Sequence, residues 1–515
     1  MSKFCERTGY NPEKGCEFLR NVLTDHMATF FSEYFDVSED VMTDFGAFNV
    51  SLVNDLPLFI DPFLLFHSEK SEYQKLHGEM IQYVTFLRDH SRQAAANEDL
   101  LKAWYCFPEI KQNWLGFSVS GNSGSGLGMK FARALSANLG RLFSDFGSEK
   151  ITEGSHLEKV CLVSSGVGRD NISDFTTNLI IDHLCSFTEQ FAKTHLRADL
   201  TTTVHIRKAK FDYATGAWRR AAYRLPVANG DYVILTPRDM LTRDENWINR
   251  GDLIRDFEQI PVAIPDAELR GQVFAYFQRV LPRHRDREPS ERERAEAISE
   301  TLLQFPQLID YFIKIKESHG DEASTVSEEK VLATEYLFIR QVQEIQRLLA
   351  SGTPFYRAGK STYSEAHARL AYLKDVIESK GGHRLFYHDG VPIEREKDLQ
   401  ILYRLVWFGT PSDVGAEVND GRGPVDFKIS RGAQDKTLVE MKLAKNSHLE
   451  RNLEKQVPIY QAASDAEHGI KAIIYFSQSE KDRAEGILSK LGILGHKDIV
   501  LIDARDDNKP SGSKA

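Results

Sequence analysis

Residues 423–430 read Gly-Pro-Val-Asp-Phe-Lys-Ile-Ser and residues 436–443 read Lys-Thr-Leu-Val-Glu-Met-Lys-Leu, two apolar stretches separated by a short polar turn. Side chains alternate between the two faces of a strand, so Glu440 and Lys442 share one face while the apolar residues around them share the other. Asp426 alternates with apolar residues in the first stretch in the same way. Two carboxylates and an ammonium are costly to bury without a partner, and a hard divalent cation is a natural one. The pattern therefore predicts two neighbouring strands that carry a metal-dependent site.

The tripeptide Glu-x-Lys is common, and its context decides its meaning. The chain holds three other copies of this tripeptide, which begin at Glu109, Glu328 and Glu378. Those copies lie in a turn-like segment, in a charged helical run and at a helix end. Only Glu440 lies on a strand of period 2 with an Asp on the strand before it, so we select this copy.

The wider pattern resembles the PD-(D/E)XK nuclease superfamily. It consists of Asp426, then Glu440-Met-Lys442, then Gln456 four residues before Tyr460 on one face of a predicted helix. The predicted order is a helix at 394–407, the two strands, the helix at 447–465, a strand at 471–476, a helix at 481–491 and a strand at 498–502. The resemblance covers residues 385–505. It implies a restriction-endonuclease-like α/β/α core with a mixed central sheet.

The residue types themselves suit phosphodiester hydrolysis. Asp426 and Glu440 offer hard oxygen ligands for one or two Mg²⁺ or Mn²⁺ ions. Lys442 would orient or help to deprotonate the attacking water and neutralise charge in the transition state. Gln456 would hydrogen-bond to Lys442, the water or a phosphate oxygen, and Tyr460 would pack or contact the nucleic-acid backbone. The alternative is a solvated hairpin face with a cross-strand ion pair.

The resemblance also implies a further acid, often supplied by the helix before the first strand. Glu396 in Arg-Glu-Lys-Asp-Leu-Gln (395–400) is one candidate, and Glu417, nine residues before Asp426, is its rival. Neither is preferred by the sequence.

Charge is distributed unevenly along the chain. The net charge is −10, and residues 1–100 hold eight Lys and Arg against seventeen Asp and Glu. Residues 207–224 form a basic run interleaved with aromatic residues, and Arg219 and Arg220 are its candidate nucleic-acid contacts. A β-hairpin with a solvated basic face is the alternative. Lys428 and Lys445 belong to a second basic cluster around the predicted site, where positive charge offsets phosphate repulsion.

Two N-terminal motifs are candidate ligand loops. The glycine-rich stretch 121–128 contains Gly124, Gly126 and Gly128 and precedes a predicted helix, a layout that can bind phosphate. It lacks the GK[ST] ending of a P-loop, so a flexible loop is the alternative. Asp170 and Asp174 follow a predicted strand at 159–164, close in sequence to Glu158, and would either cap a helix or bind a ligand or metal.

Length and composition define the class of protein. A chain of 515 residues is too long for one core, and 41% hydrophobic with 27% charged residues is ordinary for a globular protein. The longest apolar stretch, 56–66, is interrupted by Asp61 and two prolines, and the N-terminus lacks the apolar core of a signal peptide. The five cysteines form no metal-binding or paired spacing. We therefore expect a cytoplasmic protein with free thiols and no membrane contact.

The predicted organisation is that of an α/β multidomain protein. An α/β or α+β recognition or regulatory region occupies 1–275, with helices at 15–35 and 71–90 and strands at 159–164, 201–205 and 231–235. A helical linker region at 276–380 follows, with a densely charged hinge or helix start at 281–296 and amphipathic helices at 334–349 and 364–377. The nuclease-like domain covers 381–505, and 506–515 is expected to be a disordered tail.

These observations lead to one functional prediction and two alternatives. We expect a Mg²⁺-dependent nuclease, with DNA favoured over RNA by superfamily tendency, and with an organisation that resembles bacterial or phage-defence effectors. The first alternative is a catalytically silent module that binds nucleic acid. The second is an effector gated by a nucleotide or signal bound in the N-terminal region. The sequence leaves several points open: strandedness, sequence specificity, endo or exo cleavage, homo-oligomerisation and any partner protein.

Overall fold

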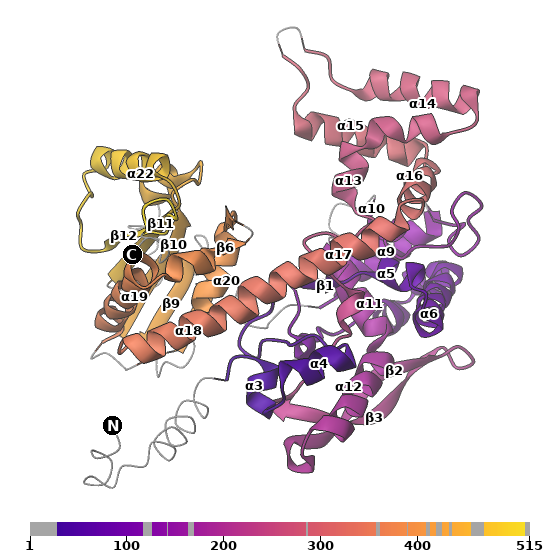
Figure 1. Cartoon of the computed structure of the whole chain (residues 1–515). Coiled ribbons are helices and arrows are strands. Elements are labelled where there is room, and N and C mark those ends of the chain that lie inside the picture. Colours follow the sequence, from indigo (N-terminus) through magenta and orange to yellow (C-terminus); the bar gives the residue numbers. More distant parts are fainter. Residues whose placement is uncertain are drawn as a thin grey trace, which may run out of the picture.

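The fold is described from a computed structural model of the whole chain (Figure 1). It describes residues 28–116, 126–141, 143–162, 169–284, 287–356, 361–388, 390–407, 413–418, 425–431, 435–454 and 468–509. Within these ranges only the backbone is described for Arg141, Cys161, Arg169, Asp170, 413–418, Val425 and Asp426.

A five-stranded mixed sheet forms the centre of the C-terminal part. Its strands are β8 (Asp413–Val418), β9 (Val425–Arg431), β10 (Asp435–Leu443), β11 (His468–Tyr475) and β12 (Ile499–Asp503), in the spatial order β12-β11-β10-β9-β8. The pairs β8–β9 and β9–β10 are antiparallel, whereas β10–β11 and β11–β12 are parallel. The predicted mixed sheet is therefore confirmed.

Helices cover both faces of this sheet. On one face, α19 (Thr362–Ser379) and α20 (Glu396–Trp407) pack against the buried residues Val439 and Met441 of β10. On the other, α22 (Gln478–Lys490) packs Leu488 against Ile473 of β11. The alternation of β10 thus buries apolar side chains on one face and leaves the second face for Glu440 and Lys442.

The N-terminal part is mainly helical. Its helices are α3 (Phe31–Phe35), α4 (Glu39–Phe45), α5 (Pro62–His67), α6 (Ser71–Asp89), α7 (Ser91–Ala96), α8 (Glu98–Tyr105), α9 (Met129–Arg141), α10 (Lys159–Leu162), α11 (Arg169–Leu179) and α12 (Ile181–His195). Its strands are β1 (Leu58–Ile60), β2 (Thr201–Asp212), β3 (Ala217–Ala228), β4 (Asp231–Tyr232) and β5 (Leu241–Arg243). All of these strands pair antiparallel, β1 with β5 and β3 with both β2 and β4, as an α+β region requires.

Two N-terminal predictions need correction. The strand predicted at 159–164 is wrong, because 159–162 form the short helix α10. There the ammonium of Lys159 is buried between Asp310, at 2.7 Å, and Glu149, at 3.2 Å, so tertiary ion pairs outweigh local β-propensity. Of the strand predicted at 231–235, only Asp231–Tyr232 form a strand, β4. Of the helix predicted at 15–35, residues 15–27 lie outside the described residues.

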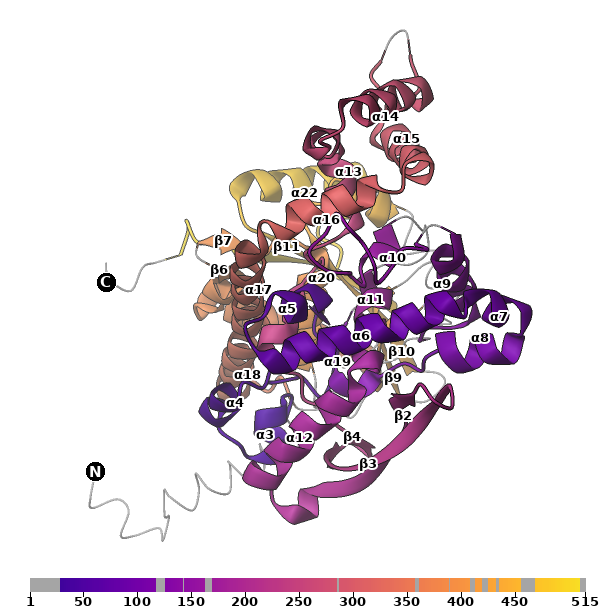
Figure 2. The same ribbon diagram turned by 90° about the vertical axis from the view of Figure 1, so that its right-hand side faces the viewer.

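The middle part is helical and starts earlier than predicted. Its helices are α13 (Arg250–Arg255), α14 (Ala267–Val280), α15 (Glu291–Gln304), α16 (Leu308–Glu317), α17 (Gly320–Glu335), the π-helical turn η6 (Tyr336–Arg340) and α18 (Gln341–Gly352). The charged segment is a helix start, since Ser290 and Glu293 form a capping box at α15. Figures 1 and 2 show α14 and α15 projecting from the molecule, while α17, η6 and α18 run from the N-terminal part to the sheet.

Short elements complete the described chain. They are the ribbon β6 (Tyr387–His388) and β7 (Val391–Pro392) and the 3₁₀ turns η1 (Lys111–Asn113), η2 (Ala198–Leu200), η3 (Arg238–Met240), η4 (Phe257–Gln259), η5 (Pro261–Ala263) and η7 (Gly382–Phe386). Of the predicted tail, 506–509 are described, and Asn508 donates to Asp503 at 2.8 Å.

None of the helices in the described ranges has both the length and the apolar character that crossing a bilayer requires.

Candidate active site

The predicted pair Glu440 and Lys442 lies on one face of β10. Glu440 is only 5% exposed and Lys442 7%, although both carry charge. Their neighbours Val439, Met441 and Leu443 belong to the core on the opposite face. Strand alternation therefore places two charged groups side by side in a nearly dry environment, where each must find a partner.

Lys471 is the partner of Glu440, and sequence reasoning missed it. In the parallel register of β10 and β11, Lys471 lies directly opposite Glu440, and its Nζ is 3.6 Å from Glu440 Oε2. The same ammonium donates to the carbonyl of Asn452 at 3.2 Å. A signal was present, because Lys471 is the only charged residue in the run Ile-Lys-Ala-Ile-Ile-Tyr (470–475). Only the register shows which carboxylate it meets.

Glu396 reaches the same site from the first turn of α20. Its Oε1 accepts hydrogen bonds from the Leu443 amide at 3.2 Å and from the Asn446 side chain at 2.7 Å. Its Oε2 lies 3.8 Å from Lys442 Nζ. The side chain of its rival Glu417 lies outside what is described, although its backbone belongs to β8. Of the two candidates, Glu396 is the one whose described side chain contacts β10.

The remaining predicted residues are placed less completely. The backbone of Asp426 lies in β9 beside Phe427, which pairs with Val439, so its register position neighbours that of Glu440. Its side chain is not described, and Gln456 and Tyr460 lie outside the described residues. Lys428 pairs in register with Leu438 and is half-buried. Lys445 is also half-buried, just beyond the end of β10.

The donor atoms fit a hard divalent cation. Glu440 Oε2 is buried and, among the described residues, accepts no hydrogen bond. Its contact with Lys471 at 3.6 Å is an ion pair, so the oxygen is chemically suited to bind a metal. Within the described ranges no group of three His, Cys, Asp or Glu side chains is positioned to hold a metal ion. Any metal site here would therefore need ligands beyond the described carboxylates, and the predicted one, Asp426, has no described side chain.

Comparison with known proteins gives two matches to family models. Residues 36–249 match the domain of unknown function DUF8370, and residues 362–478 match the domain of unknown function DUF8371. The second match contains β8 to β11 together with Glu396, Glu440 and Lys442. No curated protein and no solved structure matches the chain.

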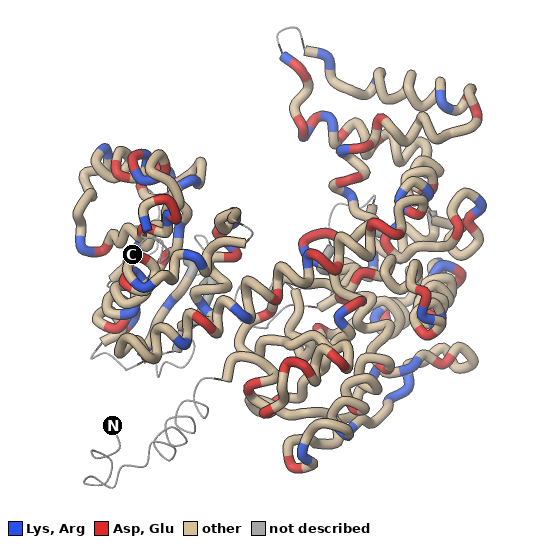
Figure 3. The backbone as a smooth tube through the Cα atoms, viewed as in Figure 1, with Lys and Arg blue, Asp and Glu red and all other residues tan. Residues whose placement is uncertain are grey.

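The basic run at 207–224 is the antiparallel hairpin β2–β3, as the alternative reading expected. Figure 3 marks its basic positions along both strands. Arg219 and Arg220 are exposed, and Arg219 pairs with Asp212.

Several aromatic residues of the hairpin pack against the helices behind it. Phe211 packs against Tyr83 of α6 with ring centroids 4.8 Å apart, and Trp218 donates to the Tyr83 hydroxyl at 3.2 Å. Tyr223 is only 7% exposed. Lys208 also points inward, where burial lowers its pKa to about 8. Phe211, Trp218 and Tyr223 therefore pack inward, whereas Tyr213 is exposed beside the basic outer face of the hairpin.

The two N-terminal loops have structural roles where they are described. Gly124 lies outside the described residues. Gly126 adopts φ +62°, and its amide donates to Glu109 at 2.8 Å, which fixes a turn before α9. Gly128 directly precedes α9, and its carbonyl accepts from Ala132. The positive φ and the tight packing explain glycine at 126 without a ligand.

Of the acids near the second loop, the structure describes the side chains of Glu158 and Asp174. The side chain of Asp170 is not described, and Asp174 lies inside α11, not at its cap. Glu158 is fully buried beside Asp61, and burial raises the pKa of both carboxyls. Burial thus favours the protonated form of these carboxyls.

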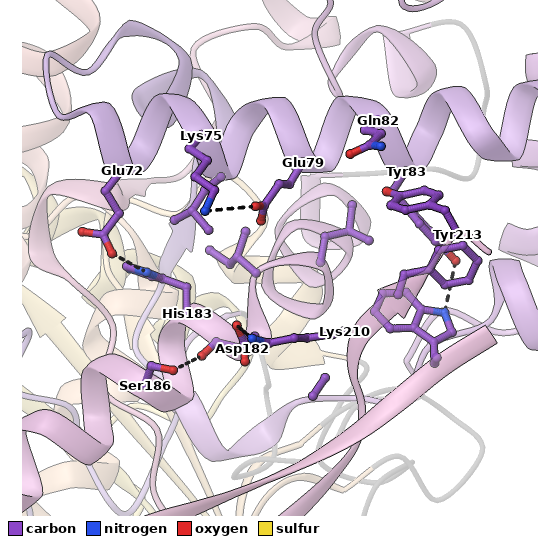
Figure 4. A pocket seen from close by; sticks show the side chains of 16 residues that line it. Glu72, Lys75, Glu79, Gln82, Tyr83, Asp182, His183, Ser186, Lys210 and Tyr213 are labelled. Carbon is purple, nitrogen blue, oxygen red and sulfur yellow. Dashed lines mark hydrogen bonds and ion pairs between the residues drawn. The ribbon is translucent and has the colours of Figure 1, made fainter. Parts of the chain in front are cut away.

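A pocket of about 450 Å³ opens between α6, α12 and the hairpin (Figure 4). Its three carboxylates, Glu72, Glu79 and Asp182, face the ammonium groups of Lys75 and Lys210 and the imidazole of His183. Burial lowers the pKa of that imidazole, which keeps it neutral near pH 7. The pocket therefore offers an anionic nucleotide no net positive charge.

Proposed function

We propose that this chain is a metal-dependent nuclease whose C-terminal part has a restriction-endonuclease-like fold. The observation that carries the proposal is the meeting of Glu440, Lys442 and Glu396 at one end of β10, with a buried Glu440 oxygen that accepts no hydrogen bond from the part of the chain that the structure describes. Charged groups are seldom buried in this way unless they act on a ligand or form a specific contact.

Glu440 and Asp426 would hold Mg²⁺ or Mn²⁺, which when bound polarises a phosphate and acidifies a coordinated water. The residues of the chain have separate tasks. Lys442, held 3.8 Å from Glu396, would orient the attacking water and balance the negative charge that develops on the phosphate. Gln456 would assist by hydrogen bonding.

Substrate contact is assigned to two basic surfaces. Lys428 and Lys445 flank the site, and Arg219 and Arg220 lie on the exposed face of the β2–β3 hairpin. Such residues bind phosphates irrespective of sequence. DNA is favoured over RNA through the superfamily resemblance, which also suggests a role in bacterial or phage defence.

A silent nucleic-acid-binding module is the second candidate, and Lys471 favours it. Its ammonium already compensates the Glu440 carboxylate without a metal ion. In that case the site would hold its shape and bind nucleic acid without turnover. Gating by a nucleotide is the less supported alternative, because the pocket in Figure 4 carries no excess of positive charge.

The test compares the wild type, Lys442→Ala and the control Lys490→Ala on plasmid, linear duplex, single-stranded DNA and RNA. Lys490 is an exposed lysine of α22 paired with Glu450. We expect cleavage by the wild type and the control with Mg²⁺ or Mn²⁺, and none by Lys442→Ala or in EDTA. Cleavage that persists in Lys442→Ala or in EDTA contradicts the proposal. Binding without cleavage by all three proteins supports the silent module.

A further inference from the structure

A cluster of four charged side chains joins the N-terminal part to the first turn of α20. Arg243, the last residue of β5, donates to Asp398 at 2.7 Å, and each side chain is only 10% exposed. Arg395 donates to both oxygens of Asp398 at 3.0 and 3.1 Å and also pairs with Asp244. Two guanidinium groups and two carboxylates thus balance each other across the contact.

This contact links residues far apart in the sequence. Arg243 lies within the first matched family segment and Asp398 within the second. The guanidinium of Arg243 also lies over the ring of Phe338 at 5.6 Å, in the π-helical turn η6. Three elements, β5, η6 and α20, therefore meet at one buried cation. π-helical turns of this kind are frequent at functional positions.

The backbone beside this contact has an unusual conformation at Asp244. Asp244 adopts φ +73°, in the left-handed region that non-glycine residues rarely occupy. The ion pair with Arg395 holds its side chain there. The buried pair of Arg243 with Asp398 fixes orientation, because its desolvation cost is recovered only when both partners are in place.

Asp398 lies two residues after Glu396 in the same first turn. Glu396 is the acid that accepts from the Leu443 amide and stands beside Lys442. Movement of this turn would move Glu396 relative to β10. We propose that Arg243 is a positioning residue: by holding Asp398, it sets the place of Glu396 in the candidate active site. The inference rests on the proposed function for its catalytic meaning, but the contact itself can be tested without substrate.

Hydrogen exchange gives that test, because the Leu443 amide donates directly to Glu396. We expect Arg243→Gln and Asp398→Asn to accelerate exchange of the Leu443 amide about tenfold or more, and Arg243→Lys to restore much of the protection. The matched control is Arg238→Gln, which breaks the ion pair with Glu335, at 2.7 Å, without touching α20. Unchanged exchange at Leu443 in both folded variants, or equal acceleration in the control, overturns the proposal.

Cleavage supplies a second test, a double-mutant cycle between Arg243→Gln and Glu396→Gln. Displacement of a reacting group by about 1 Å can lower kcat by about a hundredfold, so we expect a fall in kcat with KM within twofold. If Arg243 acts through Glu396, the double variant is no slower than Glu396→Gln alone, whereas additive losses overturn the proposal. If the wild type cuts no nucleic acid, the proposed function fails, and hydrogen exchange at Leu443 still decides whether Arg243 positions Glu396.

Discussion

Replacing Lys471 with Met would test the charge balance of the candidate site. Lys471 Nζ lies 3.6 Å from Glu440 Oε2, and these residues are 3% and 5% exposed. At an effective dielectric constant of about 20, two unit charges at this distance attract by about 4 to 5 kcal/mol. Removing one partner of such a buried pair costs about 3 to 5 kcal/mol, because the other charge stays buried. We expect Lys471→Met to weaken the β10–β11 pairing by about 3 kcal/mol.

Native-state hydrogen exchange of the β10 and β11 amides measures this loss locally, which suits a chain with several parts. A loss of about 3 kcal/mol corresponds to exchange more than a hundredfold faster, since each 1.4 kcal/mol is a factor of ten. Added Mn²⁺ should restore protection, because a cation bound at Glu440 replaces the lost charge. The double variant Lys471→Met/Glu440→Gln should also regain most of it.

The matched control is Lys490→Met in the same part of the chain. Lys490 pairs with Glu450 at the surface, where both side chains are exposed, and such pairs contribute about 0 to 1 kcal/mol. Exchange that rises less than tenfold in Lys471→Met would refute the reasoning. So would the same acceleration in the double variant, because the loss would then come from packing rather than charge.

Three further predictions concern other parts of the molecule. Burial raises the pKa of Glu158 and Asp61, so the folded chain keeps protons that the unfolded chain releases above about pH 4, and this contribution to stability is lost as pH rises. Glu158→Gln should therefore raise the melting temperature more at pH 7.5 than at pH 5, and an equal shift at both would contradict this. Gly126→Ala should destabilise the chain by about 1 to 3 kcal/mol in a thermal melt, because its Cβ would lie 2.6 Å from a backbone nitrogen at φ +62°. Arg219→Gln/Arg220→Gln should weaken DNA binding and reduce the slope of log K against log salt by up to about 2, and an unchanged slope would exclude the hairpin as a phosphate contact.

The parts of the fold that the sequence predicts well are those with local periodicity. Glu440 and Lys442 alternate with apolar residues, and β10 forms as that alternation requires. The helix predicted at 394–407 is α20, and those predicted at 71–90 and 364–377 are α6 and α19. In each, the apolar spacing matches the period of the element and decides which face is buried.

The errors arise where a distant residue decides the local structure. Residues 159–162 have β-prone side chains, yet the buried ammonium of Lys159 is held by Asp310, 151 positions further along the chain. The importance of Lys471 depends on the parallel register with β10, which no local pattern reports. The aromatic residues of the β2–β3 hairpin alternate with basic residues in sequence, but Phe211 and Trp218 pack against Tyr83 of α6.

Two buried ion pairs join segments that are far apart in the sequence, and this bears on function. Arg243 pairs with Asp398 and Lys159 with Asp310, and the partners of each pair are more than 140 residues apart. Apolar contacts tolerate sliding, whereas a buried ion pair recovers its desolvation cost only at one separation and angle. Such pairs therefore contribute little net affinity between segments but specify how they meet. At α20 that specification reaches Glu396, so the N-terminal part would set the geometry of the candidate site even where it never touches the substrate.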